Sequence, residues 1–472
     1  DDQKQKNDKE FNEFQNKITN DFSGFQSKND SIFLRFLETS WKEFKLFREE
    51  IKVRVKPVEQ PMVGGLKGNT EEPPVKNNIQ ENKQFNQPEP EQPGETLPEE
   101  STETAKPGEK AGYSGGLNFF GQQVELPAGN DLPSVRTISN AEIVNYYKSY
   151  TLNKSMANTA GEIAKFAKDI LLNDWGCLYL LILASEKYYP EMNSRVLFVW
   201  MTMLKHGFDV RIAHDASTVF LLVNFGNRIF NKLYVNISNQ RYYVYTFPRQ
   251  PEPMTDINSY EAVYPKLVKP VSLVIDQLPG LTGQTFYRKL IFTHDTVFLS
   301  ITLPLIEFMN AYPDCELPVY FNAPASDKAM KSMDKLLLPT LTGKSETEKV
   351  AIILSLVQKS MPYKIDEAQF GKENYLFADE TLYYPFSDCE DRVILLSKLI
   401  ERYTGLSSIG LDYSEHVSLG IKFTKPIQGD FVDFKGEKYY ICDPTYIGAK
   451  IGMAMDFMKN ENPEIIQTSQ KN

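Results

Sequence analysis

Residues 387–403 read Ser-Asp-Cys-Glu-Asp-Arg-Val-Ile-Leu-Leu-Ser-Lys-Leu-Ile-Glu-Arg-Tyr, and this stretch decides which fold the C-terminal part of the chain is expected to adopt. Its apolar residues recur three or four positions apart, which predicts an amphipathic helix; they are Val393, Leu396, Leu399, Ile400 and Tyr403. Cys389 then lies in the first turn, where free backbone N–H groups favour a thiolate. The acids Asp388, Glu390 and Asp391 oppose this effect. A nearby imidazolium is therefore the expected activator.

His416 is the only histidine that follows Cys389 in the sequence. It opens a run at 416–423 in which apolar and other residues alternate with the period of a β-strand. A second β-prone run, at 438–445, contains Asp443 near its end. If the two runs pair as antiparallel neighbours, Asp443 lies beside the imidazole and orients it. The order Cys389, His416, Asp443 thus supplies the nucleophile, base and orienting group that acyl transfer requires.

These motifs resemble the transglutaminase-like superfamily of cysteine hydrolases and acyltransferases, whose core is a cysteine on a helix followed by histidine and aspartate on strands. Asp388-Cys389-Glu390-Asp391 is similar to the Asp-Cys-x-Asp motif of its bacterial branch, and Asp443-Pro444-Thr445 to its Asp-Pro-Thr. The resemblance covers roughly residues 346–452. It implies a papain-like arrangement of helices on an antiparallel sheet, and a thioester formed on Cys389 from a peptide or amide substrate.

The sequence departs from the family pattern at two points. The usual His-Ala-Trp is replaced by His416-Val417-Ser418, and Gln369 is only a weak candidate for the oxyanion or substrate site. The same acyl-enzyme serves hydrolysis by water or transfer to an amine, and both remain open. The alternative is a catalytically inactive binding or scaffolding protein. No cofactor and no metal ion are expected.

Several residues near these motifs are expected to be structural. An ion pair between Arg392 and Asp391 is expected to fix the start of the helix. The cysteines outside the motif are expected to pack in the core, because no Cys-x-x-Cys or Cys/His spacing predicts a structural zinc site; they are Cys177, Cys315 and Cys442.

At 472 residues the chain exceeds what one hydrophobic core usually supports, so several domains are expected. Residues 1–50 are predicted to form an amphipathic helix, because a Phe-x-x-Phe unit repeats every 11 residues between positions 11 and 47. Its aromatic face is expected to cover the chain's own body, to self-associate or to bind a protein partner. Residues 51–116, rich in proline and glutamate, predict an extended linker.

The rest of the chain predicts an α+β protein. Residues 117–250 read as a mixed α/β domain, 251–325 as a small β-rich module, and 326–472 as the transglutaminase-like domain that carries the triad. β-runs within the module are expected at 285–292, 296–303 and 317–321.

An upstream segment repeats the order of the C-terminal motifs. Residues 194–205 predict a helix, and β-runs follow at 218–223 and 241–246. Aligned on the C-terminal motifs, Met192, Thr218 and Thr246 take the places of the cysteine, histidine and aspartate. Residues 117–250 are therefore a possible degenerate duplicate with a structural or ligand-binding role.

Charge and hydropathy narrow the class of partner. The net charge of −10 argues against nucleic acids as partners, because they bind clustered Lys and Arg. The longest apolar stretches fall short of the roughly 20 residues that cross a bilayer. Because the sequence opens with Asp1, removal of a signal peptide and export to the periplasm, cell surface or medium are expected.

Overall fold

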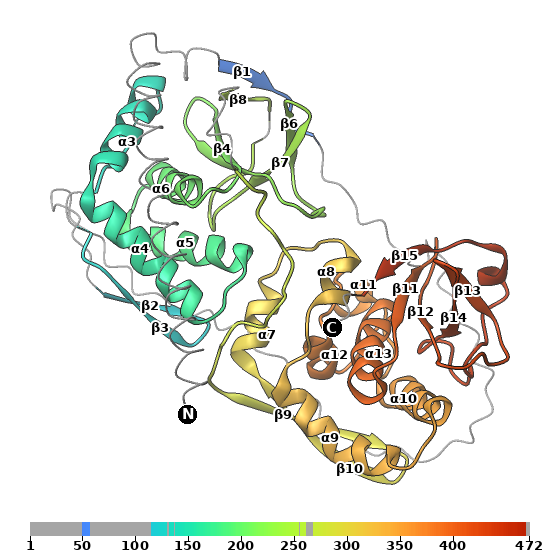
Figure 1. Ribbon diagram of the computed structural model, residues 1–472. Coiled ribbons are helices and arrows are strands. Elements are labelled where there is room, and N and C mark those ends of the chain that lie inside the picture. The colour runs from blue at the N-terminus through green and yellow to red at the C-terminus, as the bar shows by residue number, and fades with distance from the viewer. Residues whose placement is uncertain are drawn as a thin grey trace, which may run out of the picture.

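The computed structural model describes residues 50–56, 115–129, 132–135, 137–253, 255–260 and 268–468. Two lobes follow one another along the chain and meet near the helix α7 (Figure 1). Both combine helices with antiparallel sheet, which gives an α+β architecture. The Phe-x-x-Phe repeat and most of the expected linker lie outside the described residues.

The first lobe is built on a six-stranded antiparallel sheet in the order β1-β8-β4-β5-β7-β6. The sheet comprises β1 (Glu50–Val53), β4 (Val210–His214), β5 (Val219–Val223), β6 (Tyr234–Ile237), β7 (Gln240–Tyr245) and β8 (Ile257–Tyr260). Its helices and its small hairpin are α3 (Asn140–Leu152), α4 (Lys154–Asp169), α5 (Asp174–Tyr188), α6 (Met192–Lys205), β2 (Gly115–Phe119) and β3 (Gln122–Leu126). All of β5 is buried, because α6 packs on the sheet and a separate apolar cluster containing Phe220 and Leu222 fills the other side.

The second lobe is built on a five-stranded sheet in the order β13-β14-β12-β11-β15. Its strands are β11 (Ser408–Asp412), β12 (Val417–Ile421), β13 (Phe431–Phe434), β14 (Glu437–Cys442) and β15 (Glu464–Gln467). The hairpin β9 (Thr285–Phe292) and β10 (Asp295–Thr302) precedes it. Its helices are α7 (Leu303–Asn310), α8 (Leu317–Asn322), α9 (Asp327–Leu341), α10 (Glu346–Ser360), α11 (Asp366–Gln369), α12 (Ala378–Tyr383), α13 (Cys389–Thr404) and the short 3₁₀ helix η1 (Phe457–Asn460).

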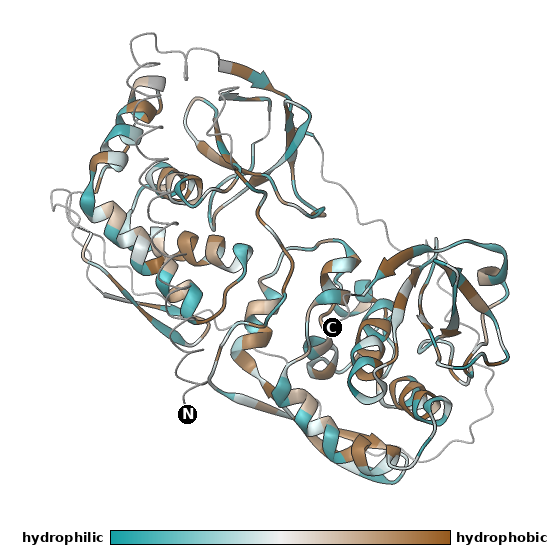
Figure 2. Ribbon diagram, viewed as in Figure 1, coloured by the Kyte–Doolittle hydropathy of each residue, from teal (hydrophilic) through white to brown (hydrophobic). Residues whose placement is uncertain are grey.

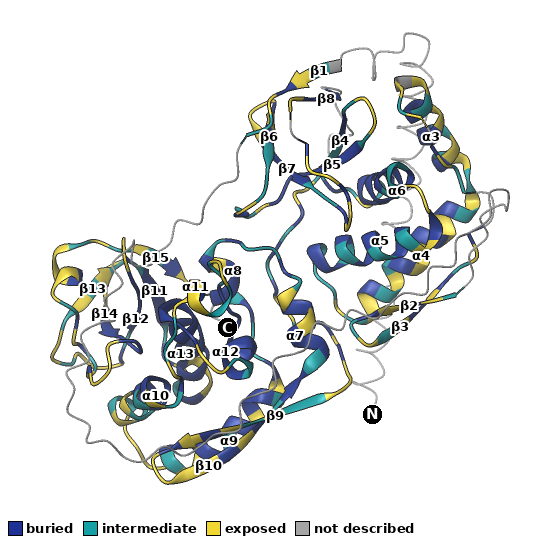
Figure 3. Ribbon diagram, turned by 180° about the vertical axis from the view of Figure 1, so that it is seen from behind, coloured by how far each residue is buried: buried dark blue, intermediate teal, exposed yellow. Residues whose placement is uncertain are grey.

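The helix α13 is the centre of the second lobe. It packs between α10 on one side and the strands β11 and β12 on the other, and almost all of it is buried (Figure 3). Apolar residues are concentrated on such interior elements, as on α5 and in the paired strands β12 and β14 (Figure 2). The predicted helix over 387–403 is therefore the buried helix of this lobe.

Two expectations from the sequence are wrong. Residues 51–53, assigned to the linker, belong to β1, which pairs with β8 and places Val53 in an apolar cluster. Residues 317–321, expected as a strand, form most of α8. Pro318 lies in the first turn of this helix, where backbone N–H groups have no partner within the helix, so the missing N–H of proline removes no hydrogen bond. The other two β-runs of the expected module form the hairpin β9–β10, whereas β8 joins the sheet of the first lobe.

The two sheets share one strand order. The five strands after α6 are arranged β8-β4-β5-β7-β6, and the five after α13 are arranged β15-β11-β12-β14-β13. The pairing register also agrees, since Val223 pairs with Tyr243 where Ile421 pairs with Tyr440. A common origin of the lobes stays a hypothesis, but the topology places α6, β5 and β7 as counterparts of α13, β12 and β14.

Gly410 marks a tight contact in the second sheet. A methyl group added there would lie 2.8 Å from Cζ of Phe321 and 3.0 Å from Cβ of Ile466. We expect Gly410→Ala to lower the free energy of unfolding by about 1–3 kcal/mol through overpacking, measured by urea denaturation. Gly161→Ala is the matched control, because its site on α4 is open and alanine favours a helix by about 1 kcal/mol. A Gly410→Ala protein as stable as the unmodified chain would contradict this packing.

Candidate active site

Cys389 is the first residue of α13, and Asp388 is its N-cap. The N–H of Asp388 donates to Oδ2 of Asp391 at 3.4 Å, within the first turn. The other oxygen of Asp391 accepts from the N–H of Leu376 at 2.8 Å, which ties the segment between α10 and α13 to the helix start. Asp391 therefore fixes the position from which the Cys389 side chain projects.

The expected ion pair between Arg392 and Asp391 is not among the contacts of the described residues. Instead the buried guanidinium donates to the backbone oxygens of Met361 and Pro444. Asp391 accepts from backbone N–H groups, because the capping geometry turns it away from Arg392. Pro444 follows Asp443 directly, so Arg392 links the helix of the cysteine to the loop of the aspartate.

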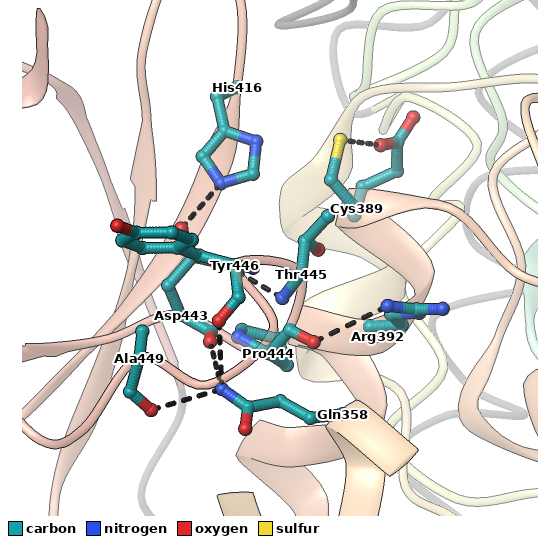
Figure 4. Close-up of polar contacts among 10 residues, drawn as sticks. Gln358, Cys389, Arg392, His416, Asp443, Pro444, Thr445, Tyr446 and Ala449 are labelled. Atoms are coloured by element: carbon teal, nitrogen blue, oxygen red, sulfur yellow. Dashed lines mark hydrogen bonds and ion pairs between the residues drawn. The ribbon is translucent and has the colours of Figure 1, made fainter. Parts of the chain in front are cut away.

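His416 and Asp443 meet at one end of the sheet. His416 immediately precedes β12 and Asp443 immediately follows β14, and these strands are antiparallel neighbours as the sequence predicts. Nε2 of His416 lies 2.8 Å from Oδ2 of Asp443 (Figure 4). Burial opposes the charge on Asp443, but His416 and the N–H groups of Tyr446 and Thr445 outweigh it and hold the pKa of Asp443 below its ordinary value. The pair is therefore a buried, oriented imidazole–carboxylate unit.

Gln358 on α10 holds the loop that follows β14. Its Nε2 lies 3.0 Å from the backbone oxygen of Asp443 and 3.1 Å from those of Tyr446 and Ala449. Sequence reasoning missed this residue. The signal was a single buried amide on the apolar face of α10, beside Leu356 and Val357, which polar-group satisfaction would require to have partners.

The thiol of Cys389 is held by its neighbour rather than by His416. Sγ donates to Oε2 of Glu390 at 2.7 Å (Figure 4), and the residue is 7% exposed. Burial first, then the carboxylates of Glu390 and Asp388, raise the pKa of Cys389 well above its ordinary value, while the N–H of Val417 lowers it. The structure therefore places the Cys389 thiol against Glu390, and the expected pair of Cys389 with His416 is not among the contacts of the described residues.

The second imidazole nitrogen is turned toward the cysteine. With Nε2 bound to Asp443, Nδ1 of His416 is the nitrogen on the side of the ring that faces Cys389 in Figure 4. Within the described ranges, no group forms a hydrogen bond with this Nδ1. The structure thus brings the three predicted residues to one end of the sheet but leaves the contact between sulfur and imidazole unmade.

Four carboxyl groups gather around the helix start. Oxygens of Asp366, Glu373, Asp388 and Glu390 all lie within 4.8 Å of one another, and Oδ1 of Asp388 and Oε1 of Glu390 are buried without a partner in the described part of the chain. Burial first, and then its acidic neighbours, raises the pKa of Asp366 to about 8. Such a group is stable only when it shares protons or holds a hard divalent cation, for which carboxylate oxygens are suitable ligands.

Sequence reasoning expected no metal ion and missed this cluster. Asp366 and Glu373 come from the segment between α10 and α13, far from Cys389 in the sequence. The first lobe has only three residues between α5 and α6 at the corresponding point. The available signal was the acidic run around Cys389, which the helix then buries.

None of the contacts found in the described residues joins the remaining predicted residues to the sulfur of Cys389. The side-chain amide of Gln369 donates to the backbone oxygen of Phe386 at 3.4 Å, so nothing places it at the sulfur. Cys315 and Cys442 are fully buried and Cys177 is half-buried; burial first raises the pKa of Cys177 to about 12.

The first lobe lacks the chemical groups at the corresponding positions. The loop before β5 and the loop before β12 contain the same backbone hydrogen bond. In the first lobe the N–H of Asp215 donates to the oxygen of Thr218 at 3.1 Å, and in the second lobe the N–H of Tyr413 donates to the oxygen of His416 at 2.8 Å. Thr218 therefore takes the place of His416. At the start of α6, Oδ1 of Asn193 accepts from the N–H of Val219 at 2.9 Å. The corresponding N–H in the second lobe, that of Val417, contacts Cys389. Asn193 rather than Met192 therefore makes the contact that corresponds to that of Cys389.

Comparison of the chain with protein-family models, curated proteins and solved structures finds no match. The geometry of the site is therefore what indicates its function. Among the described helices, none combines the length and apolar character needed to cross a bilayer.

The contact between Cys389 and Glu390 has a measurable consequence. Glu390→Gln removes a carboxylate that raises the pKa of Cys389, so the thiolate should appear at lower pH. We expect the pH midpoint of Cys389 alkylation by iodoacetamide, followed by peptide mapping, to fall in this variant. Glu367→Gln, an exposed site on α11, is the control and should leave the midpoint unchanged. Identical midpoints for all three proteins would show that Glu390 does not hold the thiol.

The carboxyl cluster should make stability depend on pH. Because the folded pKa of Asp366 is about 8 and its unfolded value is near 4, its contribution is complete below about pH 4 and lost as the pH rises toward 8. In EDTA, the melting temperature should fall between pH 5 and pH 8, and less steeply in Asp366→Asn. Millimolar calcium should reverse part of the fall at pH 8. Equal slopes for both proteins would contradict a raised pKa of Asp366 in the folded chain.

Proposed function

We propose that the chain is a transglutaminase-like cysteine hydrolase or acyltransferase that acts on peptide or amide bonds through a thioester on Cys389. The observation that carries this proposal is the buried His416–Asp443 pair, with 2.8 Å between Nε2 and Oδ2, at the sheet end beside the start of α13. A histidine oriented by a buried carboxylate next to a thiol is the arrangement that nucleophilic cysteine catalysis requires.

The proposed reaction uses each residue at a stated atom. Nδ1 of His416 takes the proton from Sγ of Cys389, and the thiolate attacks the carbonyl carbon of the substrate. The imidazolium then gives this proton to the leaving amine as the C–N bond breaks, which leaves the acyl group on sulfur. Water or a second amine, deprotonated by His416, attacks the thioester carbonyl; the C–S bond breaks, the imidazolium returns its proton to sulfur, and the carboxylic acid or the new amide is released. Asp443 stabilises the imidazolium in both halves.

Glu390 defines a resting state in this scheme. Its carboxylate accepts the hydrogen bond from the Cys389 thiol, so Sγ must rotate from Glu390 toward His416 before proton transfer. The free N–H groups at the start of α13 favour the negative charge that then develops on sulfur. The substrate is an amide in either outcome, and the acceptor decides between hydrolysis and transfer.

One observation favours the second candidate, an inactive binding protein with the same fold. The thiol is buried, and its pKa is raised by burial and then by Glu390 and Asp388, which opposes nucleophilic attack. Under this reading the His416–Asp443 pair would serve only to hold the sheet end together.

Substitutions in the triad separate the two candidates. Cys389→Ala should abolish turnover of a peptide or amide substrate, because it removes the nucleophile. His416→Ala should lower the rate of turnover nearly as much, because it removes the base. Asp443→Asn should retain more activity, since nucleophile and base remain. Rates of product formation by mass spectrometry, with melting temperatures as the folding control, give the ranking. Loss of stability without any activity in the unmodified chain would favour the binding protein.

A further inference from the structure

The triad itself offers no hydrogen-bond donor to the carbonyl oxygen of a substrate. Cys389 supplies the attacking sulfur, His416 moves the proton, and Asp443 holds the imidazole. Attack on an amide places negative charge on the carbonyl oxygen, and a donor aimed at this oxygen lowers the barrier. The amide of Gln369, the weak candidate from the sequence, donates to the backbone oxygen of Phe386 instead. The oxyanion donor must therefore be sought among other groups beside α13.

The backbone of Tyr363 is held beside the start of α13. Tyr363 forms a parallel bridge with Ser387, two residues before the cysteine. In this bridge the N–H of Ser387 donates to the oxygen of Pro362 at 3.1 Å, and the N–H of Lys364 donates to the oxygen of Ser387 at 3.3 Å. Bridged residues direct their side chains to the same face. The hydroxyl oxygen of Ser387 accepts from Nε of Arg392 at 3.4 Å, so the side chain of Tyr363 is directed to α13 as well.

The ring of Tyr363 packs on the face of α13 that carries the sulfur. The guanidinium carbon of Arg392 lies over this ring, 5.2 Å from its centroid. Arg392 follows Cys389 by three residues, a spacing that makes two side chains neighbours on one face of a helix. Arg392 is buried and also donates to the backbone oxygens of Met361 and Pro444. The ring therefore packs on a side chain that is itself held in place next to the cysteine.

The electrostatics of the phenol agree with this placement. Burial first, and then the charge that Cys389 carries as a thiolate, raise the pKa of Tyr363 above its ordinary value. Asp388 and Glu390 add smaller increases, and Arg392 opposes them. Cys389 is thus the charged neighbour with the largest effect on this hydroxyl. A phenol with a raised pKa keeps its proton at neutral pH and acts as a hydrogen-bond donor.

The hydroxyl of Tyr363 is not engaged within the chain. Among the contacts of the described residues, none joins its Oη to another polar group, and Sγ of Cys389 donates to Glu390 rather than to Tyr363. Tyr363 is half-buried, whereas the three triad residues are buried. The N–H of Cys389 is a second donor at this place, because the first N–H groups of a helix have no acceptor within it.

We propose that Tyr363 is a further catalytic residue, whose hydroxyl donates a hydrogen bond to the carbonyl oxygen of the substrate as this oxygen becomes negative. This inference rests on the proposed function and assigns its oxyanion donor. As the S–C bond forms, the π electrons of the C=O bond move onto oxygen, which accepts from Tyr363 and from the N–H of Cys389. As the leaving group departs, these electrons form the C=O bond again, and Tyr363 keeps its proton throughout.

Tyr363→Phe in the full-length chain tests the proposal, because it removes the hydroxyl and keeps the ring under Arg392. The rate at which p-nitrophenyl acetate acetylates Cys389, followed by peptide mapping, should fall on the order of 10²-fold. The rate of Cys389 alkylation by iodoacetamide should stay unchanged, because displacement at a methylene carbon forms no oxyanion. Tyr287→Phe, at an exposed aromatic on β9, should change neither rate, and equal melting temperatures show that the variants are folded.

The two reagents separate this inference from the proposed function. Equal rates of acetylation in the unmodified chain and in Tyr363→Phe would overturn the role of Tyr363 and leave the proposed function in place. An equal fall in acetylation and alkylation would also overturn it, because the hydroxyl would then act on the sulfur rather than on the carbonyl oxygen. If iodoacetamide labels Cys389 of the unmodified chain but p-nitrophenyl acetate does not, the proposed function is wrong and the role of Tyr363 with it.

Discussion

The antiparallel pairing of β12 with β14 is the constraint on which the site depends. It brings the residue before one strand to the residue after the other, and so places Nε2 of His416 2.8 Å from Oδ2 of Asp443. A shift of one residue in this register would turn the neighbouring side chains to opposite faces of the sheet. Gln358 and Arg392 then bind the loop after β14 to α10 and α13, so the positions of Asp443 and Cys389 are set by one connected frame.

The same frame has an electrostatic cost. The helix that presents Cys389 also buries Asp388, Glu390 and Asp391, and the preceding segment adds Asp366 and Glu373. Burial of several like charges is stable only with protons or a counter-ion. The thiol in turn donates to one of these carboxylates. Glu390 therefore belongs both to the carboxyl cluster and to the contact that holds the Cys389 thiol.

Local patterns predicted the elements of the site well. Helical periodicity located α13 and period-two alternation located β12, since burial on defined faces leaves these marks in the sequence, while the β-prone residues at 438–445 located β14. The order of the residues then placed His416 next to Asp443. The strand order shared by the two lobes also agrees with the helix–strand–strand repeat read from the sequence, although descent from one duplicated unit stays a hypothesis.

What the sequence could not supply were contacts between distant segments. Asp366 and Glu373 approach Asp388 only through the fold of the segment before α13. Arg392 was expected beside Asp391 but binds carbonyl oxygens of two other segments. At α8, a proline in the first turn prevailed over the β-propensity of Val319, Tyr320 and Phe321, because tertiary packing outweighs weak intrinsic preference.

The most direct test of the central claim is the rate at which p-nitrophenyl acetate acetylates Cys389, followed by peptide mapping, in the unmodified chain and in His416→Ala. If His416 takes the proton of the thiol, Cys389 of the unmodified chain should be acetylated ahead of Cys177, Cys315 and Cys442. This acetylation should slow by a factor on the order of 10² or more in His416→Ala. Equal rates at Cys389 in the two proteins, or preferential acetylation of another cysteine, would contradict the account.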